Sequence, residues 1–356
     1  TADVTYYDKY TRDQIVESEL SYLSNYQRVI INSGKISNKG WEISVSGVPV
    51  KVKNFEWKTF FNWSKNNSMV ESLPEGIDKI QIGSGVYNVK SYAEVGKPYG
   101  AIYAKTFKRD AEGYILCQLD GSPKEGQDYE YLGCVQADWR GGWNNVFRLG
   151  NFSFSVMFDF QKGGKFFSQT SIQSSVDGQS VKSLEGRDAD FFSRKILGES
   201  DEERYGFMRP QNANTPTANG QVYPDWGRPK GVVLPNCRYD EDVEGLAGQQ
   251  VLGYCTPERY WMHYTSRDIS RFIYDASYVK LREITVSYDL PKKWLRKTPF
   301  QTFRVAAVGR NIATLFANTP HGLDPQATST TGNAQGFERG FNLPSATYGF
   351  DIKVSF

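Results

Sequence analysis

The sequence lacks long apolar runs, a secretory signal and an excess of charge. No stretch approaches the roughly 18 consecutive apolar residues of a membrane-spanning helix, so helical spans are excluded. The chain opens with Thr1–Thr5, without Met and without the basic start and apolar core of a signal peptide, which predicts a mature or shortened segment whose upstream part is absent. A net charge of +2 over 356 residues gives no reason to expect nucleic acid or an anionic surface as a partner.

Residues suited to catalysis or metal binding are also scarce. The two histidines, His263 and His321, have no partner at the spacing of a metal site or a catalytic triad. The acidic run 240–242 is typical of a solvated loop, although it could also bind a cation. We therefore expect no cofactor, no metal and no enzymatic step. A β-sheet hydrolase whose carboxylates lie far apart in the chain is the least favoured alternative.

The four cysteines occur as two near pairs, Cys117 with Cys134 and Cys237 with Cys255. Their spacing does not match the Cys-x2-4-Cys clusters of a zinc site. Each pair lies in a polar, glycine-rich stretch, and two loop disulfides are plausible for a protein outside the cytoplasm. Four unpaired thiols are the alternative, because the sequence does not define the distance between the sulfur atoms.

Aromatic residues, in contrast, are abundant. They make up 15% of the chain although its mean hydropathy is only −0.54. The last nine residues show their arrangement, because apolar and polar side chains strictly alternate there. The apolar set is Tyr348, Phe350, Ile352, Val354 and Phe356. A period of two predicts a strand with one apolar and one polar face.

The same alternation recurs along the chain and predicts eight strands. The predicted strands cover residues 3–10, 41–46, 55–64, 151–160, 166–172, 278–290, 301–311 and 348–356. The strongest of them, 151–160, has Phe152, Phe154, Val156, Phe158 and Phe160 on one face. The stretches 65–145, 173–273 and 312–345 are expected to be irregular.

Two regularities indicate a membrane barrel. The connections alternate between long and short, with the short ones at 48–54, 161–164 and 291–299, as in barrels with short periplasmic turns and long outer loops. The charged residues of the patterned strands lie opposite the aromatic ones, as lipid requires, because Lys or Arg facing lipid costs about 2–4 kcal/mol. We therefore predict an all-β fold, a transmembrane antiparallel β-barrel with long extracellular loops, whose phenylalanine-rich faces contact lipid.

Two other folds are compatible with alternating strands. In a secreted or surface β-sandwich, such as a glycan-binding protein or adhesin, the apolar faces would meet in a dry core. Eight strands could also close into a small barrel with a structural role, since its interior would be filled by side chains.

Several short segments are similar to the SusC/RagA-type TonB-linked outer-membrane transporters. The most specific is the strand Ser277–Ile284, which is followed by Tyr-Asp-Leu-Pro at 288–291. The other matching segments are Val4–Tyr7, Gly34–Ile43, Gly96–Gly100, Gln161–Gly164, Gly309–Ile312 and the terminal Phe356. Because these segments are spread over the chain, the resemblance covers nearly all of it.

The resemblance implies a barrel of about 22 strands with an N-terminal plug, located in the bacterial outer membrane with its C-terminus in the periplasm. Residues 1–356 would form the C-terminal part of that barrel, and the plug and the earlier strands would lie outside this chain. The implied function is import of oligosaccharides or peptides, driven by TonB, under a SusD-like surface lipoprotein that closes the barrel as a lid. The implied partners are this lipoprotein, TonB through the missing N-terminal part, the plug and remaining barrel, and outer-membrane lipid.

Six aromatic residues in the predicted long loops are candidates for contact with substrate or lid. They are Trp139, Trp143, Trp226, Tyr254, Tyr260 and Trp261. Flat rings with a polar edge suit sugar stacking and protein interfaces alike. The alternative is that these rings pack the long loops against one another.

Overall fold

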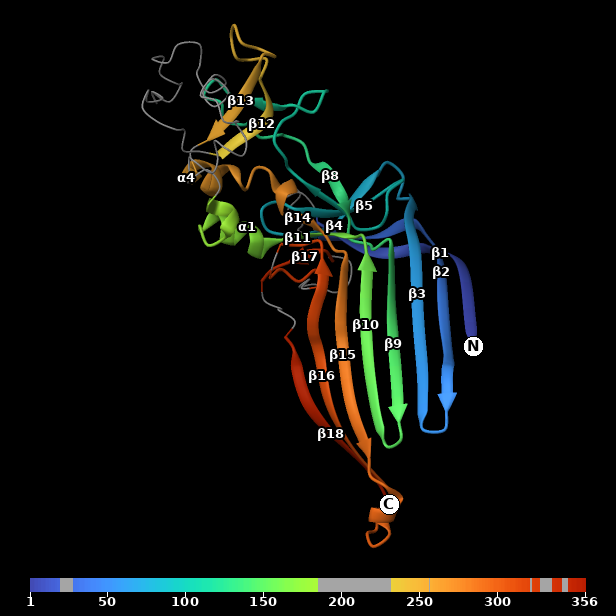
Figure 1. Cartoon of the computed structure of the whole chain (residues 1–356). Helices are drawn as coiled ribbons and strands as arrows, with labels where there is room; N and C mark the ends of the chain where they lie inside the picture. Colours follow the sequence, from blue (N-terminus) through green and yellow to red (C-terminus); the bar gives the residue numbers. More distant parts are fainter. Residues whose placement is uncertain (20–27, 185–231, 256, 321, 327–334, 341–344) are drawn as a thin grey trace.

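The computed structural model describes residues 1–19, 28–184, 232–255, 257–320, 322–326, 335–340 and 345–356. Its main element is one antiparallel sheet of eight strands in the order β1-β2-β3-β9-β10-β15-β16-β18 (Figure 1). The strands are β1 Ala2–Glu19, β2 Arg28–Val52, β3 Phe55–Ser72, β9 Trp139–Leu149, β10 Phe152–Lys162, β15 Tyr278–Asp289, β16 Thr302–Ala317 and β18 Thr347–Ser355.

The register of this sheet separates apolar from polar side chains. One row of paired residues crosses six strands as Trp57, Phe147, Phe154, Val286, Ala307 and Phe350. The adjacent row on the other side of the sheet is Glu56, Arg148, Ser153, Ser287, Ala306 and Asp351. We call these sides the apolar face and the polar face. The predicted segregation of charge in the patterned strands is thus confirmed.

The predicted lipid-contacting residues share the apolar face. Phe152, Phe154, Val156 and Phe158 occupy it on β10, and Tyr348, Phe350, Ile352 and Val354 occupy it on β18. Phe356 follows the last strand and packs against Phe300, with ring centroids 5.3 Å apart. Phe350 is 87% exposed and Phe154 40%, so no second sheet of the described residues covers this face as a sandwich core would require.

From β2 onward the connections alternate between short and long, and the short ones, after β2, β9 and β15, lie at the end of the sheet that carries the C-terminus (Figure 1). Two-residue turns join β2 to β3 and β9 to β10, and the short helix α5, Lys292–Leu295, lies between β15 and β16. Gly150 has a φ of 56° in the second turn, a conformation that suits glycine in a tight hairpin.

One predicted strand and one predicted turn are wrong. Of the predicted strand 166–172 only residues 166–168 are extended, within β11, Lys165–Ser168, of a separate sheet, because the Ser168 side chain then caps helix α1, Gln169–Val176. The eighth strand of the main sheet is instead β9, within a stretch expected to be irregular. The segment Gln161–Gly164 therefore lies at the long-loop end, and β10 runs opposite to the predicted direction.

The long connections form three small sheets and several short helices at the other end of the main sheet (Figure 1). The first sheet contains β4 Lys79–Ser84, β5 Lys90–Glu94, β6 Ala101–Ala104 and β8 Glu130–Cys134. The second contains β7 Ile115–Cys117, β12 Val232–Tyr239 and β13 Gln250–Cys255, and the third contains β11, β14 Ile273–Asp275 and β17 Phe337–Glu338. The helical elements are η2 Val181–Leu184, α4 Pro257–Arg259, η3 Tyr260–Tyr264 and η4 Ile269–Phe272.

These connections, rather than the main sheet, hold most of the buried apolar side chains. Phe107, Trp261, Phe167 and Phe337 are all nearly inaccessible, and they lie in two clusters formed by the loop sheets and helices. None of the helices in the described part of the chain is long and apolar enough to cross a membrane.

The apolar face also has a boundary on the side of the long connections. From Trp41 to Val52 its residues on β2 carry no charge. On the same face, Lys65 lies level with Trp41, and Asp8, Lys39 and Lys162 lie beyond Trp41 or Phe160. The eleven steps from Trp41 to Val52, at about 3.3 Å each and tilted by about 40°, span roughly 28 Å, close to the apolar band of about 25 Å of outer-membrane barrels. Rings at the upper edge, such as Tyr6 and Trp41 at 4.9 Å, suit an interfacial girdle.

The two faces of β10 predict opposite responses to a new charge. Phe154→Arg places a guanidinium on the apolar face and is expected to cost about 2–4 kcal/mol of folding free energy in a membrane. Ser155→Arg, on the polar face one residue away, is the matched control and should cost less than about 1 kcal/mol. The measurement is the urea dependence of folding in phospholipid vesicles, followed by heat-modifiable gel migration. Equal losses for the two variants would contradict the assignment of the faces.

Candidate functional site

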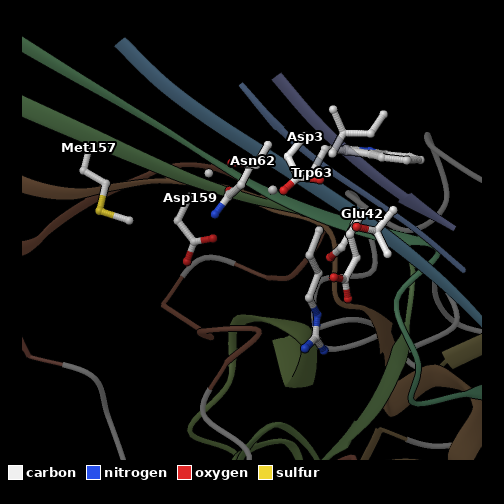
Figure 2. Close-up of a pocket in the computed structure, with 13 residues that line it drawn as sticks. Asp3, Glu42, Asn62, Trp63, Met157 and Asp159 are labelled. Atoms are coloured by element: carbon white, nitrogen blue, oxygen red, sulfur yellow. The ribbon is translucent and has the colours of Figure 1, made fainter. Parts of the chain in front are cut away.

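The polar face carries a hollow of about 560 Å³ over strands β1, β2, β3, β9 and β10 (Figure 2). Its charged residues are Asp3, Glu42, Arg140 and Asp159. The remaining lining residues are Thr5, Ile43, Ser44, Asn62, Trp63, Ser64, Gly141, Gly142 and Met157. Because these strands alternate, the side chains that reach the hollow come from the polar face, which includes Met157, whereas Ile43, Trp63 and Gly141 belong to the apolar face.

Arg140 joins this hollow to two others. It also lines a cavity of about 480 Å³ that continues over Asp159, Tyr278 and Gln326, and one of about 250 Å³ beside Ser64 and Gln335. The residue lies on β9, where it pairs with Ser64 of β3 and Gln161 of β10. Its side chain is therefore the common wall of the three hollows, at the point where the main sheet meets the long connections.

The charges of the hollow are separated rather than paired. Glu42, Ser64 and Arg140 form one row across β2, β3 and β9, so Glu42 and Arg140 stand two strand spacings apart, or about 10 Å. None of the described residues forms an ion pair with Arg140, Glu42 or Asp3. The hollow therefore presents a cation and two carboxylates to a solute, and it can bind a molecule that carries both signs of charge.

Asp159, in contrast, belongs to a closed network with β15. It accepts hydrogen bonds from Arg282 and from the Tyr278 hydroxyl. Gln326 donates to the same hydroxyl at 2.5 Å and accepts from Arg282 at 2.7 Å. Lys280, nearly buried, binds Asp324 at 2.5 Å. These contacts fix the segment 324–326 of the last long connection against the polar face, beside the hollow.

Two of the aromatic residues predicted to lie in loops belong to a strand of the main sheet. Trp139 and Trp143 lie on β9, on the apolar face, and Trp143 donates from its indole nitrogen to Thr59 at 2.9 Å. Their predicted position in irregular loops is wrong, because residues 139–149 continue the alternation of the neighbouring strands. Both rings face away from the hollow, so the geometry gives no support to substrate or lid contact through them.

The other predicted aromatics fall in the long connections. Tyr260 and Trp261 are each only 1% exposed in the core that contains Phe107, which matches loop packing, the alternative reading of these rings. Their ring centroids are 5.2 Å apart in an edge-to-face arrangement. Tyr254 lies on β13, but its side chain, like the whole of Trp226, lies outside the described residues.

The cysteines are not arranged as the sequence pairs suggested. Cys134, on β8, lies 3.4 Å from the carbonyl oxygen of Tyr99, whereas Cys117 belongs to another sheet and another core. Cys237 pairs with Val251 on β13, four positions from Cys255. Neither predicted disulfide is present, and the described residues contain no His, Cys, Asp or Glu cluster suited to a metal ion.

The acidic run 240–242 is likewise not a simple solvated loop. Asp240 is buried and forms ion pairs with Lys124 at 2.7 Å and Lys108 at 2.9 Å, while Asp242 is exposed and binds Lys124 as well. Burial alone would raise the pKa of Asp240, but hydrogen bonds from the two lysines outweigh burial and hold this pKa at about 2. The ion pairs of Asp240 with Lys108 and Lys124 thus join the connection after β3 to the connection after β10.

Known proteins resemble the chain in sequence and in fold. No family model matches the chain. It is 24% identical to "TonB-dependent receptor P3" of Formosa agariphila, over 96% of the chain and 30% of that receptor, and 26% identical to "TonB-dependent receptor P26" over 47% of the chain and 19% of that receptor. Two structures of the RagAB peptide transporter superpose over the whole chain and 33% of theirs, with TM-scores of 0.61 and 0.59 at 16% and 17% identity.

The resemblance to SusC/RagA-type TonB-dependent transporters is confirmed. The antiparallel sheet is the fold of a section of the RagA-type barrel, so the predicted fold class is confirmed too. This SusC/RagA-like chain spans about a third of the length of the relatives it matches. Those relatives are receptors and transporters rather than enzymes.

The depressed pKa of Asp240 predicts a pH dependence of the long-loop region. A carboxyl with a pKa near 4 when unfolded and about 2 when folded adds about 2 kcal/mol of stability above pH 4, and this is lost as the pH falls toward 2. Asp240→Asn should therefore lower the free energy of unfolding by about 2 kcal/mol at pH 7 and have little effect at pH 2. Asp242→Asn, at the exposed neighbour, is the control. The free energy of unfolding of the loops is measured for both variants from their protease resistance at increasing urea concentration. If Asp240→Asn lowered this free energy equally at pH 7 and pH 2, the ionised Asp240 carboxylate would not be the source of the stability.

Proposed function

We propose that this chain forms the C-terminal eight strands of the barrel of an outer-membrane nutrient importer. The observation that carries the proposal is the register, which leaves the apolar face without charge between the level of Phe160 and the short turns, with an exposed aromatic row there, and puts the charges of that zone on the polar face. In an outer-membrane barrel, lipid tails contact the apolar face and the water-filled interior contacts the polar face. In a soluble protein, both faces of this sheet would be exposed to water.

The edges of the sheet require further strands. β1 and β18 are each hydrogen-bonded to one neighbour only within the described sheet, which leaves one row of N–H and C=O groups open on each. Hydrocarbon does not tolerate such groups, since each costs several kcal/mol when unsatisfied. Additional strands outside this chain therefore complete the barrel, and the plug that TonB acts on lies outside it as well.

The orientation follows from the connections. Short turns face the periplasm in outer-membrane barrels, and the C-terminus lies at the same end as the short turns. The packed loop sheets then lie on the cell surface, where a SusD-like lipoprotein would bind as a lid. The solid loop core, with Trp261 and Phe337 fully buried, gives this surface a defined shape for a partner.

Peptides are the substrate class that the hollow supports best. Arg140 opposite Glu42 and Asp3 suits a solute with a free carboxylate and a free amine, whereas a neutral oligosaccharide makes little use of separated charges. The structural relatives are named as peptide transporters, which agrees with this choice. Import of oligosaccharides is the other outcome that the test below distinguishes.

Substitution of Arg140 tests the substrate class. In cells that express the complete transporter, Arg140→Gln should reduce uptake of a defined mixture of short peptides about tenfold, the effect of roughly 1.4 kcal/mol of lost binding. Arg148→Gln is the matched control, since Arg148 lies on the same strand and face but outside the hollow. Uptake is measured by mass spectrometry of the residual medium. Unchanged peptide uptake together with active uptake of oligosaccharides would contradict the peptide assignment.

A further inference from the structure

The short connection between β15 and β16 carries a dense patch of positive charge. Residues 291–299, which we call the basic turn, contain four cations and no Asp or Glu. The cations are Lys292, Lys293, Arg296 and Lys297. The other two short turns, 53–54 and 150–151, contain one lysine between them. The net charge of +2 does not reveal this local excess, because acidic residues elsewhere in the chain balance it.

The four cations lie close together. Helix α5 is a single turn, and Arg296 continues its backbone with a φ of −55° and a ψ of −27°. Most pairs among positions 292, 293, 296 and 297 are adjacent or three or four residues apart, a spacing that puts side chains on one side of a helical turn. All four side chains are exposed, and none is paired with a carboxylate of the described residues. Like charges at this spacing repel one another, so an anion outside the chain would stabilise the turn.

The backbone of the basic turn is closed and leaves an indole in solvent. The Pro291 carbonyl accepts from the Trp294 N–H at 2.9 Å, and the Leu295 carbonyl accepts from the N–H and the hydroxyl of Thr298 at 2.9 and 2.8 Å. Leu295 is 7% exposed, whereas Trp294 is 60% exposed. The turn lies beyond the end of the sheet, beside the C-terminus (Figure 1). An exposed tryptophan among cations is typical of the interface between hydrocarbon and water.

The basic turn borders the apolar face. Phe300, directly after the turn, packs against Phe303 of that face with ring centroids 6.0 Å apart. The apolar positions along β15 begin at Val279, opposite Phe160, and continue to Leu290, directly after the strand. These eleven steps, at about 3.3 Å each and tilted by about 40°, span roughly 28 Å, the thickness of the apolar band. The basic turn begins at the next residue, so its cations lie at the level of the lipid headgroups.

We propose that the basic turn binds the phosphate groups of anionic phospholipids, such as phosphatidylglycerol, in the periplasmic leaflet of the membrane. This inference rests on the proposed function, because it requires the sheet to cross the outer membrane with its short turns in the periplasm. Clustered Lys and Arg side chains attract anionic headgroups, and Trp294 anchors the turn at the same level. An acidic protein is the other partner that suits four cations, but the exposed indole and the adjoining apolar face favour lipid.

Native mass spectrometry of the complete transporter tests the site. The protein in detergent is titrated with phosphatidylglycerol or with phosphatidylcholine of the same acyl chains, and bound lipids are counted. The glutamine variant carries Lys292→Gln, Lys293→Gln, Arg296→Gln and Lys297→Gln. We expect the wild type to prefer phosphatidylglycerol, and the glutamine variant to bind it at least tenfold more weakly, since each cation contributes about fivefold. Its affinity for phosphatidylcholine should change less than twofold.

A variant that keeps the charge is the matched control. It carries Lys292→Arg, Lys293→Arg, Arg296→Lys and Lys297→Arg. Because its charge is unchanged, it should bind phosphatidylglycerol within threefold of the wild type. In intact cells, a photo-crosslinking amino acid in place of Trp294 should form adducts with phospholipid. Equal phosphatidylglycerol affinity of the wild type and the glutamine variant would overturn the proposal, and so would crosslinks from position 294 to a protein instead of lipid.

The membrane fraction and peptide uptake are recorded for the same proteins. If the glutamine variant kept its phosphatidylglycerol affinity in a transporter that reaches the outer membrane, the lipid site alone would be refuted. A protein that stays soluble and monomeric without detergent would refute the proposed function.

Discussion

The structure depends on one constraint, which is that a backbone in hydrocarbon must find all its hydrogen-bond partners within the protein. An antiparallel sheet meets this requirement along its length, and it places successive side chains of each strand on opposite faces. Trp57, Phe147 and Phe154 accordingly form a continuous apolar surface, with Trp57 and Phe147 stacked at 5.9 Å. Glu56 and Arg148, one residue away on the same strands, face the other side.

This constraint also explains where the core lies. A sheet with lipid on one face and water on the other has no dry layer, and the buried residues Trp261, Phe167 and Phe337 accordingly lie in the long connections. The connections pack as a small globular unit, held by apolar clusters and by the ion pairs of Asp240 across two loops. At the mouth of the polar face, contacts with Tyr278, Lys280 and Arg282 of β15 hold the segment 324–326 beside Arg140 of β9.

The sequence predicts strands well where large apolar residues alternate, as in 151–160 and 348–356. It fails for β9, because Gly141 and Gly142 weaken the alternation and resemble loop residues. The packing explains the glycine at position 141, because a Cβ there would collide with the ring of Phe160. Arg140 was not predicted as a site residue, because it lies in this unpredicted strand. The odd-numbered positions of Trp139, Trp143 and Phe147 were the signal in the sequence that could have identified the strand. The arrangement of the cysteines was not predictable, because it depends on parallel pairing between two distant loops.

Spin labels along β10 test the central claim most directly. Labels at positions 152–159 of the complete protein in phospholipid vesicles report collisions with oxygen, which concentrates in lipid, and with a water-soluble nickel chelate. The account predicts a period of two, with oxygen favoured at Phe152, Phe154, Val156 and Phe158 and the chelate favoured at Ser153, Ser155 and Asp159. Uniform protection of both faces, as in a dry sandwich, or the opposite phase would contradict it.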